Sequence, residues 1–173
     1  MAALLQTAGH HEITLCTRRP LVGLKVKTLE GDIVVQARNV TDPALAEAVD
    51  WVLVATKAYD AQGAAAWFET LSSGKAPVAV LQNGVEHRER FAAYVRPEWI
   101  VPVIIDCPVE RQGDGTVLQR GAMQMKVEDG RLGKEFARLF TETKAEIELT
   151  EDFLTAAWRK LCVNAAGVIP ALI

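Results

Sequence analysis

A lysine and an asparagine spaced by four residues form the pair in this sequence that is best suited to reducing a carbonyl. Lys160 and Asn164 lie in a segment with helical periodicity, so this spacing places both side chains on one helix face. Carbonyl reduction needs a hydride at carbon and a proton at the developing alkoxide, and a lysine ammonium can stabilise that charge and supply the proton. Asn164 can hydrogen-bond the same molecule. A lone lysine on a helix is more often a solvated charge, so its role depends on which other polar residues the fold brings near it.

Polar residues also end three of the predicted strands. Arg18 follows the first of these strands, Lys57 follows a buried strand, and Asn83 follows the next buried strand. When strands run parallel in a doubly wound sheet, ligands bind outside their carboxyl ends, so all three residues are candidates for a binding site. Each also has an ordinary alternative: a solvated strand end for Arg18, a lysine extended to solvent for Lys57, and a plain Asn-Gly turn at Asn83.

Arg18 bears on the choice of cofactor. A dinucleotide-binding sheet that uses NAD places an acid at the end of its second strand to accept from the ribose 2′-hydroxyl, whereas an arginine there suits the 2′-phosphate of NADP. The strand Glu12–Thr17 runs directly into Arg18 and Arg19, with no acid after it. The pattern favours NADP, with Arg18 as the stronger candidate of the two arginines.

The elements that must position these residues alternate between strand and helix. Strands are predicted over residues 13–17, 25–29, 33–37, 51–55, 78–81, 99–105, 116–119, 124–128 and 145–149, with a hairpin within 25–37 and an antiparallel pair within 116–128. Helices are predicted over residues 2–8, 44–48, 60–71, 86–94 and 132–143. This alternation predicts an α/β fold with a Rossmann-like, doubly wound and mainly parallel sheet.

A change in character near Thr150 predicts a domain boundary. Residues 1–150 would form an NADP-binding domain, and residues 151–173 would begin a helical substrate domain whose first helix is capped by Thr150. The buried face of this helix is predicted to hold Phe153, Ala157, Leu161 and Cys162, and the helix is expected to break near Gly167 and Pro170. Lys160 and Asn164 then belong to the second domain, and the strand-end residues to the first.

Composition sets broad limits on function. The 173 residues are 50% hydrophobic, which suffices for one cored domain, and a net charge of −3 gives no general attraction to nucleic acid or to anionic membranes. No apolar run approaches the ~20 residues of a membrane span. Cys16, Cys107 and Cys162 have no metal-like spacing and are predicted to be reduced and mostly buried, which favours a cytoplasmic protein.

The histidines do not predict a metal site. His10, His11 and His87 lack the spacing of metal ligands and are expected to be exposed, in a loop and on a helix. The charged segment Glu86–Arg90 is expected to be the solvated face of that helix.

Three segments together resemble the ketopantoate reductase family: Val54–Ala58, Leu81–Gly84 and Trp158–Asn164. Members of this family reduce 2-dehydropantoate (ketopantoate) to pantoate with NADPH, on the route to pantothenate and coenzyme A. The resemblance implies that the chain belongs to an NADPH-dependent oxidoreductase that acts on a small 2-keto acid.

The resemblance also implies a role for each candidate residue. Arg18 and Lys57 would contact NADPH, Asn83 would lie between cofactor and substrate, Lys160 would donate the proton, and Asn164 would hold the substrate. Neither nucleic acid nor a membrane is expected as a partner, and self-association into a homo-oligomer stays open.

The sequence departs from the family pattern in three respects. No GxGxxG turn precedes the helix predicted over residues 2–8, Ile169 stands before Pro170 where the family often has a second asparagine, and the glutamate and serine of the family's helical domain lie beyond residue 173. We therefore expect a ketopantoate reductase truncated at both ends. The alternatives are a reductase of another 2-keto acid and a catalytically inactive module that binds NADP or a partner.

Overall fold

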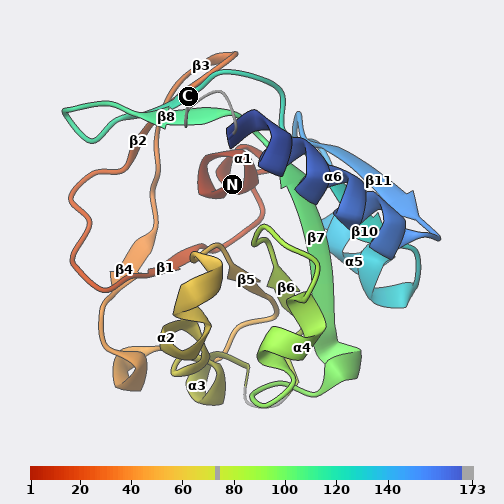
Figure 1. Cartoon of the computed structure of the whole chain (residues 1–173). Helices are drawn as coiled ribbons and strands as arrows, with labels where there is room; N and C mark the ends of the chain where they lie inside the picture. Colours follow the sequence, from red (N-terminus) through yellow and green to blue (C-terminus); the bar gives the residue numbers. More distant parts are fainter. Residues whose placement is uncertain (73–74, 169–173) are drawn as a thin grey trace.

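The chain folds as an α/β protein in which helices cover both faces of a central sheet (Figure 1). The computed structural model describes residues 1–72 and 75–168. The α-helices are α1 (Ala2–Thr7), α2 (Ala61–Ala65), α3 (Phe68–Ser72), α4 (His87–Phe91), α5 (Arg131–Arg138) and α6 (Phe153–Val168). Short 3₁₀ helices are η1 (Pro43–Leu45), η2 (Ala58–Asp60) and η3 (Pro97–Trp99).

The strands fall into three sheets. They are β1 (Thr14–Cys16), β2 (Lys25–Thr28), β3 (Gly31–Val34), β4 (Arg38–Val40), β5 (Val52–Val54), β6 (Val78–Val80), β7 (Ile100–Asp106), β8 (Val109–Arg111), β9 (Val117–Gln119), β10 (Gln124–Glu128) and β11 (Glu146–Thr150). The central sheet has the order β11-β10-β7-β6-β5. Within it β5, β6 and β7 are parallel, β10 runs antiparallel to β7, and β11 runs parallel to β10.

Strand β6 lies at the centre of the core because both of its faces are covered. Val78 and Val80 pack in one apolar cluster with Phe68, Leu71 and Phe91 from α3 and α4. Ala79 and Leu81 belong to a second cluster, formed with Leu4 and Leu5 of α1, Phe136 of α5 and Phe140 just after it. Successive side chains of a strand point to opposite faces, so a continuous apolar run fits a sheet with helices on both sides. The predicted doubly wound arrangement is confirmed.

Strands β1 and β4 form a separate parallel pair instead of joining the central sheet. Among the described residues, β1 pairs with β4 alone and β5 pairs with β6 alone, so each presents one open edge. An ion pair spans the ends of these two regions, with Arg18 Nη1 3.4 Å from an Asp60 carboxylate oxygen.

The third sheet has the order β3-β2-β9-β8, and it corrects one predicted pairing. The hairpin of β2 and β3 is confirmed. The predicted antiparallel pair within 116–128 is wrong, because β9 pairs with β2 and β8 whereas β10 pairs with β7 and β11. The reason is burial: Met125 and Val127 of β10 are fully buried in the core, whereas β9 is only half-buried. Strands β4 and β8 were not predicted.

Four predicted helices are shorter than expected. The segments 86–94 and 132–143 are reduced to α4 and α5. The segment 60–71 is divided into η2, α2 and α3. The segment 44–48 is reduced to η1, which Asp42 caps, with its carboxylate accepting from the Ala44 amide at 2.9 Å. Asparagine and aspartate side chains stabilise a helix start in this way because they satisfy an otherwise unpaired amide.

Helix α6 begins later than predicted and buries a narrower face. Asp152, not Thr150, caps it, and its carboxylate accepts from the Thr155 amide at 3.2 Å. Phe153 and Ala157 are buried against Ile104 of β7, as predicted for that face. Cys162 is exposed, so its predicted burial is wrong. The buried positions of α6 recur at intervals of about one turn, and Cys162 lies beside that stripe. Gly167 lies within α6, and Pro170 lies outside the described residues.

Gly133 allows α5 to approach the end of β10, and we predict that Gly133→Ala destabilises the fold. A Cβ at this position would lie 2.1 Å from the Glu128 carbonyl oxygen, which is backbone and cannot move aside. Replacing a helical glycine by alanine normally favours the helix by up to about 1 kcal/mol. The overlap should instead lower the free energy of unfolding by about 1–3 kcal/mol, measured by chemical denaturation.

Gly167→Ala is the matched control for this measurement. Gly167 also lies in a helix, but an added Cβ there meets no atom of the described residues within 4 Å. This change should be neutral or slightly stabilising. Equal effects of the two substitutions would contradict the proposed close approach.

Candidate active site

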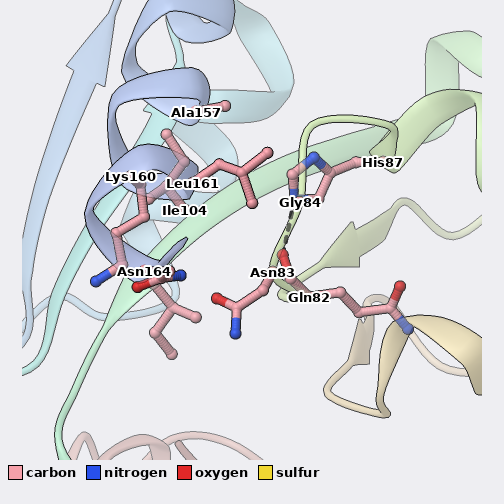
Figure 2. A pocket seen from close by; sticks show the side chains of 10 residues that line it. Gln82, Asn83, Gly84, His87, Ile104, Ala157, Lys160, Leu161 and Asn164 are labelled. Carbon is pink, nitrogen blue, oxygen red and sulfur yellow. Dashed lines mark hydrogen bonds between the residues drawn. The ribbon is translucent and has the colours of Figure 1, made fainter. Parts of the chain in front are cut away.

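A pocket lies between α6 and the carboxyl ends of β6 and β7 (Figure 2). It is a small hollow that is partly open to solvent. Three of the predicted site residues line it: Asn83, Lys160 and Asn164. Its other lining residues are Gln82, Gly84, His87, Ile104, Ile105, Ala157 and Leu161.

The register of α6 brings Lys160 and Asn164 to this pocket. Phe153 and Ala157 seat the helix on Ile104, and the same face continues one and two turns later with Lys160–Leu161 and Asn164. Figure 2 shows these side chains on the helix and Asn83 on the loop across from them. The pocket therefore combines an apolar floor with an ammonium group and two amide side chains at its rim.

Lys160 forms an ion pair at the edge of the pocket. Its Nζ lies 2.6 Å from an Asp106 carboxylate oxygen, and the side chain of Lys160 is 23% exposed whereas that of Asp106 is 55% exposed. Asp106 is the last residue of β7. It was not among the predicted site residues, although it ends a strand as Lys57 and Asn83 do, so the strand-end rule would have found it.

Gln82 fixes the loop that presents Asn83. The Gln82 side chain is buried, and its amide nitrogen donates to the Thr56 hydroxyl at 2.9 Å and to the Lys57 carbonyl at 3.3 Å. Its side-chain oxygen accepts from Arg90 at 3.0 Å. These bonds join the ends of β5 and β6 to α4, while Asn83 itself is exposed. A buried amide needs such partners, so this network determines where the loop leaves the sheet.

Gly84 is required by the same loop. Its φ of +118° lies in a region that favours glycine, and an added Cβ would come within 3.2 Å of Arg90 Nη2. The Asn-Gly pair is therefore more constrained than an ordinary exposed turn.

His87 is buried, and the expectation that it would be exposed is wrong. One ring nitrogen donates to the Gln82 carbonyl at 2.8 Å, and the ring meets Phe153 of α6 edge-on at a centroid distance of 5.9 Å. His87 and Phe91 are four apart and face the core together, so the charged neighbours in the sequence concealed an inward-facing stripe. Burial lowers the pKa of His87; the Gln82 carbonyl opposes this shift and the charge of Arg90 adds to it.

The family is decided by sequence comparison. The family model described as Ketopantoate reductase PanE/ApbA matches residues 1–131. The chain belongs to the ketopantoate reductase family. It is 42% identical over 173 residues to a 2-dehydropantoate 2-reductase of Caulobacter vibrioides, covering 100% of this chain and 60% of that protein. A 2-dehydropantoate 2-reductase of Mycobacterium tuberculosis is 38% identical over 167 residues, covering 95% of this chain and 56% of that protein.

A solved structure agrees with this assignment. The PanE/ApbA family ketopantoate reductase from Ralstonia eutropha matches with a TM-score of 0.82 at 27% identity, covering 95% of this chain and 57% of that one. The chain thus spans less than two thirds of the length of each of these relatives. The Rossmann-like α/β architecture is shared along nearly its whole length.

Arg18 and Lys57 lie at strand ends, outside the residues that line the pocket. Arg18 is 84% exposed and pairs with Asp60, and Lys57 is exposed while its carbonyl accepts from Gln82. Two exposed cations that follow β1 and β5 suit the phosphates of a dinucleotide. Asp60 was not predicted, because it follows a different strand and meets Arg18 only in the folded chain.

Two of the remaining ionisable groups are partly covered thiols. Burial raises the pKa of the Cys16 and Cys107 thiols, both half-buried. Across residues 1–72 and 75–168, no group of three or more His, Cys, Asp or Glu residues could hold a metal ion. In the same part of the chain, every helix is too short or too polar to cross a membrane.

We predict that His87 makes stability fall in mild acid. The pKa of the folded-state imidazole is lowered from the ordinary 6.5, so at a pH below that value the unfolded chain binds a proton that the folded chain resists. The free energy of unfolding should therefore decrease between about pH 7.5 and about pH 5.5. In a His87→Gln variant this decrease should be smaller, measured by urea denaturation at each pH.

His10→Gln is the control, because His10 is exposed. It should retain the pH dependence of the unmodified chain. The same dependence in both variants would show that other groups are responsible.

Proposed function

We propose that this chain supplies the nucleotide-binding and keto-acid-binding surfaces of an NADPH-dependent 2-dehydropantoate 2-reductase. The observation that carries the proposal is the meeting of Asn83, Lys160 and Asn164 around one small pocket in a member of the ketopantoate reductase family. The product would be pantoate, for pantothenate and coenzyme A synthesis. Residues 1–150 would be the NADP-binding domain, and residues 151–173 the start of a helical substrate domain.

Lys160 would act as the proton donor. Its ammonium lies at the rim of the pocket, where it can stabilise the negative charge that develops on the keto oxygen and then transfer a proton to it. Asn83 and Asn164 would orient the carbonyl and carboxylate groups, since each amide offers both a donor and an acceptor. Ile104, Ala157 and Leu161 would pack against the branched alkyl part of the acid.

Arg18 and Lys57 would hold the cofactor by its phosphates. The exposed guanidinium of Arg18 suits the 2′-phosphate of NADPH, and Lys57 follows β5 at the start of η2. Asn83 would lie between cofactor and substrate. When bound, NADPH supplies the hydride to the carbonyl carbon.

Two other functions are alternatives. The presence of Ile169 before Pro170 favours a reductase of another 2-keto acid, which comparison of turnover across branched 2-keto acids would reveal. The second alternative is an inactive NADP-binding or interaction module, for which NADPH would bind without turnover. A cytoplasmic location and self-association into a homo-oligomer remain predictions.

Substitution of Lys160 tests the proposed chemistry. Lys160→Ala in the full-length gene product should lower kcat for ketopantoate by about 10²-fold or more, because a positioned acid and a charge are both lost. NADPH affinity, measured by fluorescence titration, should be unchanged. Arg159→Ala is the control, because Arg159 is exposed on the same helix. A variant that keeps its kcat would leave Lys160 with a structural role.

Substitution of Arg18 tests the cofactor preference. Arg18→Gln should raise KM for NADPH about tenfold while leaving KM for NADH unchanged, because only NADPH carries the 2′-phosphate. Arg19→Gln should have a much smaller effect. Equal changes for the two cofactors would argue against a contact between Arg18 and the 2′-phosphate.

A further inference from the structure

We propose that Asp106 is a positioning residue that holds the ammonium of Lys160 at the rim of the pocket. This inference rests on the proposed function, because Asp106 affects catalysis only if Lys160 is the proton donor. The carboxylate lies 2.6 Å from Nζ, close enough for a charge-assisted hydrogen bond.

The two residues come from different elements, so their contact fixes a distance that neither element sets alone. Asp106 ends β7, whose position is fixed by pairing with β6 on one side and β10 on the other. Lys160 lies two turns along α6 from Phe153, which seats that helix on β7. The ion pair therefore fastens the end of a long, flexible side chain to the rigid sheet.

The pair crosses the boundary between pocket and solvent. The Lys160 side chain is largely covered, whereas more than half of the Asp106 side chain is exposed. An ammonium has three hydrogens, so one bond to Asp106 leaves two for a keto acid. A carboxylate on the solvent side also leaves the lysine connected to water, from which a donated proton can be replaced.

A second lysine–carboxylate ion pair in the chain has the same N–O distance but lies away from the pocket. Lys126 Nζ lies 2.6 Å from a Glu148 carboxylate oxygen, between β10 and β11, and neither residue lines the pocket. Exposed pairs of this kind add little to stability. The Lys126–Glu148 pair is therefore a matched control, since it reports what a carboxylate does to a nearby lysine in the absence of a site.

The first test measures the reactivity of each lysine and needs no turnover. The protein is treated with an amine-reactive succinimidyl ester, and the labelling rate of each lysine is followed by mass spectrometry. Asp106→Ala should speed labelling of Lys160 several-fold and leave Lys126 unchanged, whereas Glu148→Ala should do the reverse. Unchanged labelling of Lys160 in the Asp106→Ala variant would overturn the proposal.

The second test separates positioning from substrate binding. In the full-length gene product, Asp106→Ala should lower kcat for ketopantoate about tenfold with little change in KM, and Asp106→Glu should recover part of the loss. In a Lys160→Ala background the same substitution should have no further effect, because Asp106 acts only through Lys160. Glu148→Ala should leave both kinetic constants unchanged.

The outcomes distinguish this inference from the proposed function. An unchanged kcat in the Asp106→Ala variant, or an equal loss in the Lys160→Ala background, overturns the positioning role. If the unmodified protein reduces no 2-keto acid, the proposed function fails, and the labelling experiment still decides whether Asp106 holds Lys160.

Discussion

Burial of β6 on both faces is the constraint on which the rest of the structure depends. Val78, Ala79 and Val80 are inaccessible to solvent, and their side chains alternate between two apolar clusters. A shift of one residue along the strand would exchange those clusters, so the register is strongly fixed. The chain leaves the sheet at one position, where Gln82 is still buried and must be satisfied and Asn83 is the first exposed residue.

The opposite wall of the pocket is helix α6. It packs on the sheet through Phe153 and Ala157 and pairs with the end of β7 through Lys160, while Leu154, Trp158 and Val163 on its outer side are exposed. His87 contributes to this seating because its ring touches Phe153 and its nitrogen binds the carbonyl of Gln82. One buried imidazole thus contacts both walls, so the position of the helix and the shape of the loop depend on each other.

The sequence predicts the parts of this architecture that follow from local patterns. The apolar run at Val78–Leu81 and the four-residue spacing of Lys160 and Asn164 carry their meaning within a short window, since strand and helix periodicity alone assign their faces. The choice of partner for β9 is different. Its half-buried residues could pair with more than one strand. The pairing depends on β10, whose apolar side chains are buried in the core and therefore place β10 in the central sheet.

Contacts between distant side chains were beyond prediction for a related reason. Asp106 and Lys160 meet because α6 packs on the sheet with Lys160, two turns after Phe153, beside the end of β7. The distance between the two side chains cannot be read from their separation in the sequence. The burial of His87 likewise depends on how α4 lies on the sheet, since its immediate neighbours are charged. The presence of a polar residue at a strand end was visible in the sequence, but its partner was not.

The pocket is formed by a loop that is fixed to the sheet and by the separate helix α6. Ligand binding is therefore linked to the docking of that helix. A molecule held by Asn83 and Asn164 together can bind only while α6 rests on Ile104. Its apparent affinity is therefore its intrinsic affinity multiplied by the fraction of chains in which the helix is seated. By the same linkage, a higher ligand concentration raises the fraction of chains in which α6 is docked. A change at Phe153 would weaken binding without altering any atom that the ligand touches.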